Sequence, residues 1–140
     1  MTEATSADER TKAILANDVV SVRYQIADIG RAIEFYTSRL GFSLEMRAGN
    51  AFASVALGNL RLILSGPGSS GARAMPDGRV QQPGGWNRIL LYVDDLEGRI
   101  RSLQAAGVPF RNKVESGPGG SQILIEDPDG NPIELHQPAK

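Results

Sequence analysis

The sequence contains no cysteine and a single histidine, His136, among its 140 residues. The lack of cysteine excludes disulfides, thiolate zinc sites and cysteine nucleophiles. With one histidine, a metal site of two histidines and one carboxylate cannot form within one chain. An excess of charge of one sign is also missing, because 15 basic and 16 acidic residues give a net charge of −1. No surplus of positive charge is present to hold a polyanion, so nucleic acid is not expected as a partner.

Long apolar runs are absent as well. No run approaches the roughly 18 residues that a membrane-spanning helix needs, so no membrane association is expected. The first ten residues lack the basic start and apolar stretch of a secretory signal, and a cytoplasmic location is therefore the expectation. Hydrophobic residues make up 41% of the chain and charged residues 22%, which is typical of a globular domain. Residues 1–17 are polar at their start and are expected to form a flexible segment.

Periodicity predicts a strand and a helix at the start of the ordered chain. Apolar and polar residues alternate over residues 20–26, which is typical of a half-buried strand. Asp28 can cap a helix whose apolar residues recur at helical spacing until Gly41. Three further strand-like runs follow, separated by turn residues, at 42–46, 52–57 and 60–64.

The same order of elements begins again after residue 85. A strand-like run at 87–93 leads to Asp95, a second candidate helix cap, and to a helical stripe that ends at Gly107. Three strand-like runs follow at 109–114, 122–126 and 132–136. The sequence Ile26-Ala-Asp-Ile29 is repeated as Val93-Asp-Asp-Leu96. Two halves of about 70 residues with the same element order indicate an internal duplication.

The duplication predicts an α+β fold in which residues 18–140 form one domain of two tandem βαβββ modules, 18–65 and 86–138. Residues 66–85 are rich in glycine and proline and are interpreted as a linker or a flap over the binding site. Each module has a sheet with one face covered by its helix. We expect the two open faces to form a shared cup for a small molecule. Candidate residues on these faces are Ser21, Arg23, Gln25, Arg88, Leu90, Tyr92, Glu134 and His136.

Three parts of the sequence resemble a known superfamily. They are 29–42 (IGRAIEFYTSRLGF), 93–96 (VDDL) with 103–110 (LQAAGVPF), and 126–137 (EDPDGNPIELHQ). In these parts the chain closely resembles the vicinal oxygen chelate superfamily, which contains glyoxalase I, bleomycin-resistance proteins and extradiol dioxygenases. The resemblance covers about residues 19–138 and implies a glyoxalase-like fold. It also implies a homodimer, because members often dimerise and some exchange halves.

Metal-binding members of the superfamily place ligands on the first and last strands of each half. The resemblance carries these points to Ser21, Leu62, Arg88 and Glu134. Only Glu134 is a usual ligand, since leucine cannot coordinate a metal and arginine brings a permanent positive charge. The resemblance therefore implies a cup with no metal and no other cofactor. The alternative is that Glu134 joins ligands from a partner chain.

The candidate site residues allow functional and structural interpretations. Arg88 and Glu134 are expected to form an ion pair on facing strands, which either accepts an anionic ligand or only holds the cup together. Glu134 and His136 share a strand face and are candidate catalytic residues, although a lone histidine near a strand end is more often simply polar. Trp86 can stack on a planar ligand or fix the linker to the core. The candidate substrate-binding residues are Ser21, Arg23, Gln25, Leu62, Trp86, Arg88 and Tyr92.

These features together predict a metal-independent small-molecule-binding protein, similar to the drug-sequestering members of the superfamily. The alternative is a lyase, isomerase or dioxygenase-like enzyme that acts on a small carbonyl or carboxylate compound. In that enzyme Arg88 or Arg23 would polarise the substrate, and Glu134 or His136 would act as the base.

Light scattering at micromolar protein concentration is expected to give the mass of two chains. The resemblance implies a dimer, and each module has sheet edges that are free to pair. The mass of a single chain under these conditions would contradict this expectation.

Overall fold

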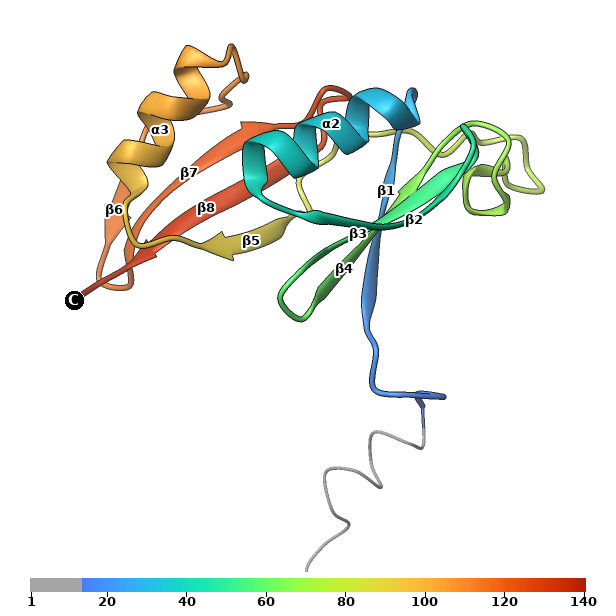
Figure 1. The fold of residues 1–140 in the computed structure, drawn as a ribbon, viewed down its shortest axis with the longest axis horizontal. Coiled ribbons are helices and arrows are strands. Elements are labelled where there is room, and N and C mark those ends of the chain that lie inside the picture. Colours follow the sequence, from blue (N-terminus) through green and yellow to red (C-terminus); the bar gives the residue numbers. More distant parts are fainter. Residues whose placement is uncertain (1–13) are drawn as a thin grey trace, which may run out of the picture.

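The structure, a computed structural model, describes residues 14–140. Most of the predicted flexible segment at 1–17 therefore lies outside the described residues. Within this range the chain forms two four-stranded sheets and two α-helices, with the order β-α-β-β-β occurring twice (Figure 1). The predicted α+β fold of two tandem modules is confirmed. No helix in residues 14–140 is long and apolar enough to cross a membrane.

The first module has the sheet order β1-β4-β3-β2, in which β1 and β4 are parallel and the other neighbours antiparallel. Its elements are β1 (Ser21–Gln25), α2 (Ile29–Leu40), β2 (Ser43–Ala48), β3 (Phe52–Leu57) and β4 (Leu60–Ser65). Asp28 caps α2 by accepting a hydrogen bond from the backbone N–H of Arg31 at 3.0 Å. Gly41 follows the helix with a φ of 80°, a left-handed conformation that favours glycine. Both predicted ends of this helix are confirmed.

The second module repeats this arrangement with the sheet order β5-β8-β7-β6. Its elements are β5 (Ile89–Tyr92), α3 (Leu96–Ala105), β6 (Glu115–Gly117), β7 (Gly120–Glu126) and β8 (Pro132–Pro138).

The strand predicted at 109–114 is wrong, because only Phe110 forms an isolated bridge there and the strand begins at Glu115. The side chain of Asn112 accepts a hydrogen bond from the backbone N–H of Leu124 at 2.9 Å. A side chain thus takes the place of a backbone acceptor, which interrupts the ladder.

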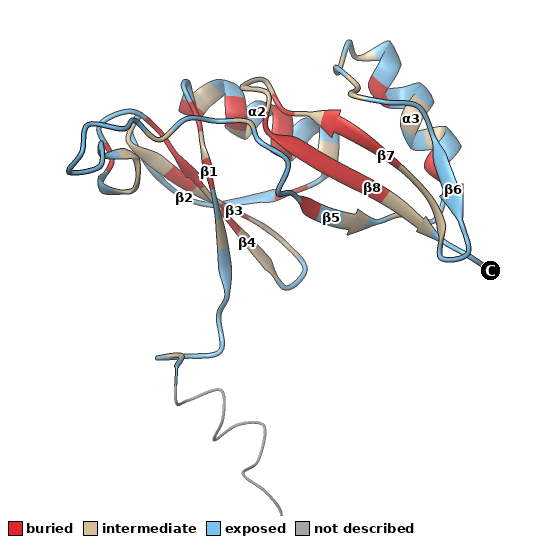
Figure 2. Cartoon of the chain, turned by 180° about the vertical axis from the view of Figure 1, so that it is seen from behind, coloured by how far each residue is buried: buried red, intermediate tan, exposed pale blue. Residues whose placement is uncertain are grey.

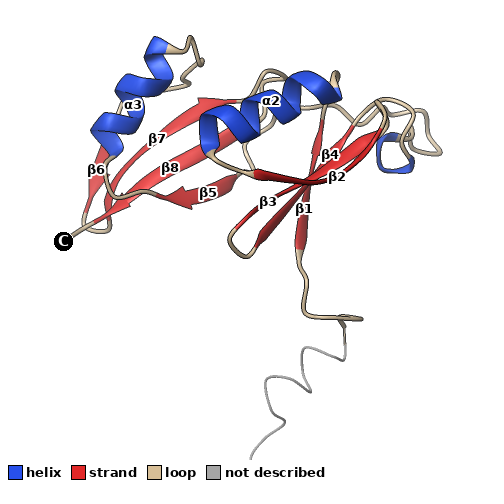
Figure 3. Ribbon diagram, viewed as in Figure 1, coloured by secondary structure: helices blue, strands red, loops and turns tan. Residues whose placement is uncertain are grey.

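Both helices lie on the same side of the two sheets (Figure 3). Buried residues concentrate between α2 and its sheet and along β7 and β8 (Figure 2). Helix α2 contributes four buried side chains, whereas α3 contributes two. The core includes Ile29, Ala32, Phe35, Tyr36, Val55, Leu62, Leu64, Leu96, Leu103, Ile125, Ile133 and Leu135. One face of each sheet is therefore covered by its helix, as the strand periodicity predicted.

The segment between the modules contains one short 3₁₀ helix, η1 (Ser70–Ala72), among turns. It packs on the end of β1, where the Gln25 side chain donates hydrogen bonds to the carbonyl of Gly71 at 2.9 Å and to the side chain of Gln81 at 3.2 Å. At the start of this segment a side chain on Gly66 would collide with the backbone carbonyl of Asn50. Only glycine fits this close approach.

The loop between β7 and β8, Asp127–Asn131, joins the two modules. The hydroxyl of Tyr36, on α2, donates a hydrogen bond to Asp127 at 2.8 Å. The side chain of Asn131 donates to the carbonyl of Gln25 at 2.9 Å and accepts from the backbone N–H of Gly84 at 2.8 Å. One five-residue loop thus contacts the first strand and helix of the first module and the end of the linker.

Asp127 is only 2% exposed, and its carboxylate is held by several donors. Besides Tyr36, it accepts hydrogen bonds from the backbone and side chain of Asn131 at 2.9 Å each and from the backbone of Asp129 at 2.8 Å. Burial raises the pKa of Asp127, although these donors stabilise the charged form and lower it in part. Burial likewise raises the pKa of Tyr36 far above its usual range, so its hydroxyl stays protonated as a donor.

A Tyr36→Phe substitution is expected to lower the free energy of unfolding by about 2 kcal/mol, because a buried carboxylate loses one of its donors. Urea denaturation followed by circular dichroism measures this change. Tyr92→Phe is the matched control, since Tyr92 is 73% exposed, and its effect should stay within about 0.5 kcal/mol. Equal effects of the two substitutions would contradict the role of the Asp127 cluster.

Candidate functional site

The open face of the second sheet brings together several of the predicted residues. Strand pairing places Leu90 beside Glu134 and Tyr92 beside His136. The alternate residues of β5, Ile89 and Leu91, and their partners on β8 face α3 and the core. Arg88, two residues before Leu90 and on the same face, extends toward β8. Side-chain alternation thus gives β5 and β8 one apolar face and one polar face.

Arg88 and Glu134 form the predicted ion pair. The Nε and Nη2 atoms of Arg88 both donate to Oε1 of Glu134, at 3.0 and 2.8 Å. The side chain of Glu134 is 6% exposed and that of Arg88 is 29% exposed. Arg88 directly precedes β5, and Glu134 lies on the neighbouring strand β8 of the same sheet, not on a facing strand as predicted. The guanidinium compensates the desolvation of a nearly buried carboxylate.

His136 contacts the second oxygen of the same carboxylate. Its Nδ1 lies 3.4 Å from Oε2 of Glu134, and its Nε2 lies 3.2 Å from the carbonyl oxygen of Gly119. A carbonyl can only accept, so the hydrogen bond to Gly119 requires the proton on Nε2. In a neutral ring, Nδ1 is then an acceptor that faces another acceptor, and this buried atom has no hydrogen-bond partner among the described residues.

Trp86 lies on the surface and does not enter the core, with 70% of it exposed. The guanidinium carbon of Arg111 lies 4.8 Å from the centre of a Trp86 ring, in a cation–π contact. Arg111 itself is fixed by an ion pair with Glu126 at 2.8 Å and by the carbonyls of Gly85 and Gly130. One side of the indole is thus supported by a fixed cation. Sequence analysis missed Arg111, because its partners are distant in sequence and no local pattern marks them.

The first sheet places its predicted residues differently. Arg23 donates to the hydroxyl of Ser65 at 2.6 Å, and Gln25 is held by the linker. Ser21 is exposed at the beginning of β1. Leu62 is fully buried on the face that contacts α2, so its predicted role in the cup is wrong. The strand register instead pairs Arg23 with Ile63, which is the first-module equivalent of Glu134.

Leu62 and Glu134 each lie four residues after the glycine of a Gly-Asn pair, Gly58-Asn59 and Gly130-Asn131, but the two pairs are not equivalent. Gly58-Asn59 is a complete two-residue turn between Leu57 and Leu60. Gly130-Asn131, in contrast, ends a five-residue loop between Glu126 and Pro132. Leu57, which precedes the first turn, lies on the helix side of its sheet. Glu126, which precedes the second loop, lies on the open side of its sheet. The residues after the two Gly-Asn pairs therefore face opposite sides.

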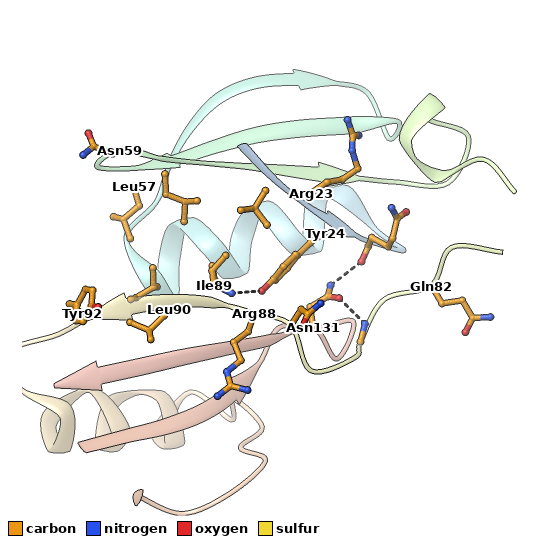
Figure 4. A pocket seen from close by; sticks show the side chains of 16 residues that line it. Arg23, Tyr24, Leu57, Asn59, Gln82, Arg88, Ile89, Leu90, Tyr92 and Asn131 are labelled. Carbon is orange, nitrogen blue, oxygen red and sulfur yellow. Dashed lines mark hydrogen bonds between the residues drawn. The ribbon is translucent and has the colours of Figure 1, made fainter. Parts of the chain in front are cut away.

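A cavity of about 900 Å³ lies between the two modules, and we call it the module cavity. Its walls come from β1, the β3–β4 turn, β5 and the end of the linker (Figure 4). Four predicted residues line it: Arg23, Gln25, Arg88 and Tyr92. Five do not: Ser21, Leu62, Trp86, Glu134 and His136. In Figure 4 the Arg23 and Arg88 side chains extend to opposite sides of the cavity, each toward its own sheet.

The lining of the module cavity contains two arginines and no acidic residue. Its apolar part consists of Val22, Tyr24, Leu57, Leu60, Ile89, Leu90 and Leu91. Its neutral polar part, which sequence analysis missed, consists of Asn59, Gln82, Asn87 and Asn131. The ring of Tyr24 crosses between the modules, because its hydroxyl donates to the carbonyl of Pro132 at 2.7 Å and accepts from the backbone of Ile89 at 2.9 Å. An apolar ligand with an acidic group fits this lining.

The side chains at the superfamily's metal position do not supply a metal-ligand set. No group of three or more histidine, aspartate or glutamate residues close enough to hold a metal ion occurs in residues 14–140. Oxygen Oε1 of Glu134 already accepts two hydrogen bonds from Arg88. Ile63, the first-module equivalent of Glu134, offers no donor atom. A guanidinium thus lies where a cation would have to bind.

An Arg88→Met substitution is expected to lower the free energy of unfolding by about 1–3 kcal/mol, because it leaves a nearly buried carboxylate without its partner. Arg79→Met is the control. Arg79 pairs with Asp77 at 2.9 Å on the exposed surface, and the Arg88–Glu134 distance is similar, 2.8 Å. Loss of the exposed pair should cost less than about 0.5 kcal/mol in urea denaturation. Similar losses in both variants would show that the Arg88 pair is energetically an ordinary surface pair.

Comparison with known proteins gives the family of the chain. Residues 18–135 match the family model of the glyoxalase/bleomycin resistance protein/dioxygenase superfamily. None of the curated proteins matches the sequence.

Several solved structures share the fold. TnmS3, an antibiotic-binding protein from Streptomyces sp. CB03234, is 29% identical, with coverage of 89% of this chain and 99% of its own and a TM-score of 0.67. A superfamily member from Sphaerobacter thermophilus is 27% identical, with coverage of 86% and 97% and a TM-score of 0.69. A lactoylglutathione lyase from Agrobacterium tumefaciens is 20% identical, with coverage of 89% and 95% and a TM-score of 0.67. The chain belongs to the glyoxalase/bleomycin resistance protein/dioxygenase superfamily.

Proposed function

We propose that the protein binds a small acidic molecule in the module cavity, without a metal and without converting it. The observation that carries this proposal is the position of Arg88. Arg88 takes the place of a superfamily metal ligand, its guanidinium is held by Glu134, and the residue lines a cavity that contains no acidic side chain. A fixed guanidinium is a strong hydrogen-bond donor to a carboxylate or phenolate.

The size and walls of the module cavity support a drug-sized ligand. Its volume of about 900 Å³ lies within the range of small-molecule sites, and its walls are largely aliphatic with two tyrosines, Tyr24 and Tyr92. Neutral amide side chains at Asn59, Gln82 and Asn87 can orient polar groups of the ligand. The antibiotic-binding relative TnmS3 supports the same class of function, since it is 29% identical over nearly its whole length.

The arrangement of the candidate catalytic residues favours binding over turnover. Neither Glu134 nor His136 lines the module cavity. The two oxygens of Glu134 already face Arg88 and His136, so neither is directed at a ligand there. The acid–base pair lies behind Arg88 and acts as its support.

A lyase or isomerase is the second candidate function, because one observation favours it. Nδ1 of His136 is buried beside Glu134 and makes no hydrogen bond within the described part of the chain. An imidazole with a free acceptor next to a carboxylate is a common acid–base arrangement. A substrate would have to displace Arg88 from Glu134 to reach it.

We further propose that a second copy of the chain covers part of the site. All six residues of β2 are exposed, including Leu44 and Met46. Leu90 and Tyr92 on β5, and Trp86 just before this strand, are also exposed large apolar side chains. Large apolar side chains that stay exposed are typical of surfaces that a partner covers.

The ligand class is tested with paired carboxylates and their neutral amides, screened by thermal shift and measured by calorimetry. Carboxylates are expected to bind more tightly, and Arg88→Met should weaken the best of them by roughly 10- to 100-fold, because a charge-assisted hydrogen bond is lost. Arg88→Lys should keep part of the affinity. Arg79→Met, which alters an arginine outside the cavity, should leave it unchanged.

The absence of turnover and of a metal is tested in the same samples. The bound carboxylate should be recovered unchanged, and affinity should not depend on a chelator. Stoichiometric zinc, nickel, manganese or iron in the purified protein would contradict metal independence. Conversion of the carboxylate that disappears in Glu134→Gln would favour the enzyme over the binding protein.

A further inference from the structure

A second cavity lies on the helix side of the sheets, and we call it the interhelix cavity. It has a volume of about 390 Å³ and is lined by the end of α2, the β3–β4 turn, β5, α3 and β8. Its base includes Leu103 and Leu135, which are 3% and 2% exposed. Leu40, Leu57, Leu91 and Val93 form its walls and are only partly buried. The partly buried walls thus expose aliphatic surface to water.

Two arginines line the same cavity. Arg39 is in the last turn of α2, and Arg99 is the fourth residue of α3. Neither guanidinium makes a hydrogen bond or an ion pair with any residue between 14 and 140. Asp94, which lines a neighbouring depression with Arg99, forms no ion pair with it within 4.0 Å. No acidic side chain lines the interhelix cavity.

Helix stability explains one of these arginines but not the other. A positive charge at the C-terminal end of a helix, as at Arg39, is favourable, because it faces the negative end of the helix dipole. Arg99 lies close to the N-terminal end of α3, where the same dipole disfavours a positive charge. The position of Arg99 is thus unfavourable for its own helix. An anion bound between Arg99 and Arg39 would compensate this cost.

We propose that the interhelix cavity binds an amphipathic carboxylate, with its aliphatic chain against Leu57, Leu103 and Leu135 and its carboxylate on Arg39 and Arg99. This site is separate from the one around Arg88. The two cavities share Leu57, Leu91 and Tyr92 as walls, but the arginines of one do not line the other. An aliphatic base with arginines at the same cavity fits one class of ligand, a chain with a single acidic end.

Decanoate is the probe, with decanol as its neutral counterpart, and calorimetry measures both. Decanoate is expected to bind saturably and more tightly than decanol. Among hexanoate, octanoate and decanoate, affinity should rise by up to about fourfold for each added methylene that is buried. The double variant Arg39→Gln/Arg99→Gln should lose at least tenfold in decanoate affinity and leave decanol binding unchanged.

Two control variants separate this site from the module cavity and from general surface charge. Arg101→Gln removes a charge from the same helix at a residue outside the cavity, and it should leave decanoate affinity unchanged. Arg88→Met should also leave it unchanged, although it is expected to weaken ligands of the module cavity. Methyl resonances of Leu103 and Leu135 should shift on titration in the wild-type protein.

Three results would overturn the proposal. The first is no saturable decanoate binding. The second is equal binding of decanoate by the wild-type protein and the double arginine variant. The third is a loss of decanoate affinity in Arg88→Met without shifts of the Leu103 and Leu135 methyls, which would assign the carboxylate to the module cavity. Circular dichroism of each variant confirms that a loss of affinity is not a loss of fold, since Arg39 and Arg99 are not core residues.

Discussion

The buried carboxylate of Asp127 is the interaction on which the arrangement of the two modules depends. Each module can form its own sheet and helix from local patterns, but nothing in those patterns fixes one module against the other. Asp127 does so by accepting from Tyr36 of the first module while it orders its own loop. Asn131 extends the connection to β1 and to the linker. Together with the Tyr24 hydroxyl, this loop fixes β1 close to β5, where the module cavity lies.

In the proposed function, Arg88 changes the chemistry that the superfamily scaffold can perform. A metal ion presents open coordination positions and a high local charge, and both allow it to activate a bound oxygen. A guanidinium presents directed N–H donors and no coordination position, so it recognises an oxyanion by geometry. Glu134 keeps this guanidinium in place and loses its own freedom to act as a base. Under the proposed function, the arginine at this position thus replaces a reactive centre with a recognition element.

The sequence predicted what depends on local periodicity and failed where distant segments decide the outcome. The strands, the helix caps at Asp28 and Asp95, and the duplication follow from spacing that is visible in the chain. Leu62 was misplaced because two identical Gly-Asn pairs occupy different positions in their turns, which only strand register reveals. The strand expected at 109–114 was lost to the side chain of Asn112. Arg111 and the amides of the module cavity were missed because their neighbours come from other elements.

Tyr24 has a consequence for how this protein can diversify. Its ring forms part of the wall of the module cavity, while its hydroxyl connects β1 to β5 and β8. Selection for a new ligand cannot freely alter a residue that also holds the two halves of the domain in register. The β3–β4 turn, with Leu57, Asn59 and Leu60, lines the same cavity and carries no comparable structural duty. Divergence of ligand preference among descendants of this chain should therefore accumulate on the turn side of the cavity, while the Tyr24 side stays fixed.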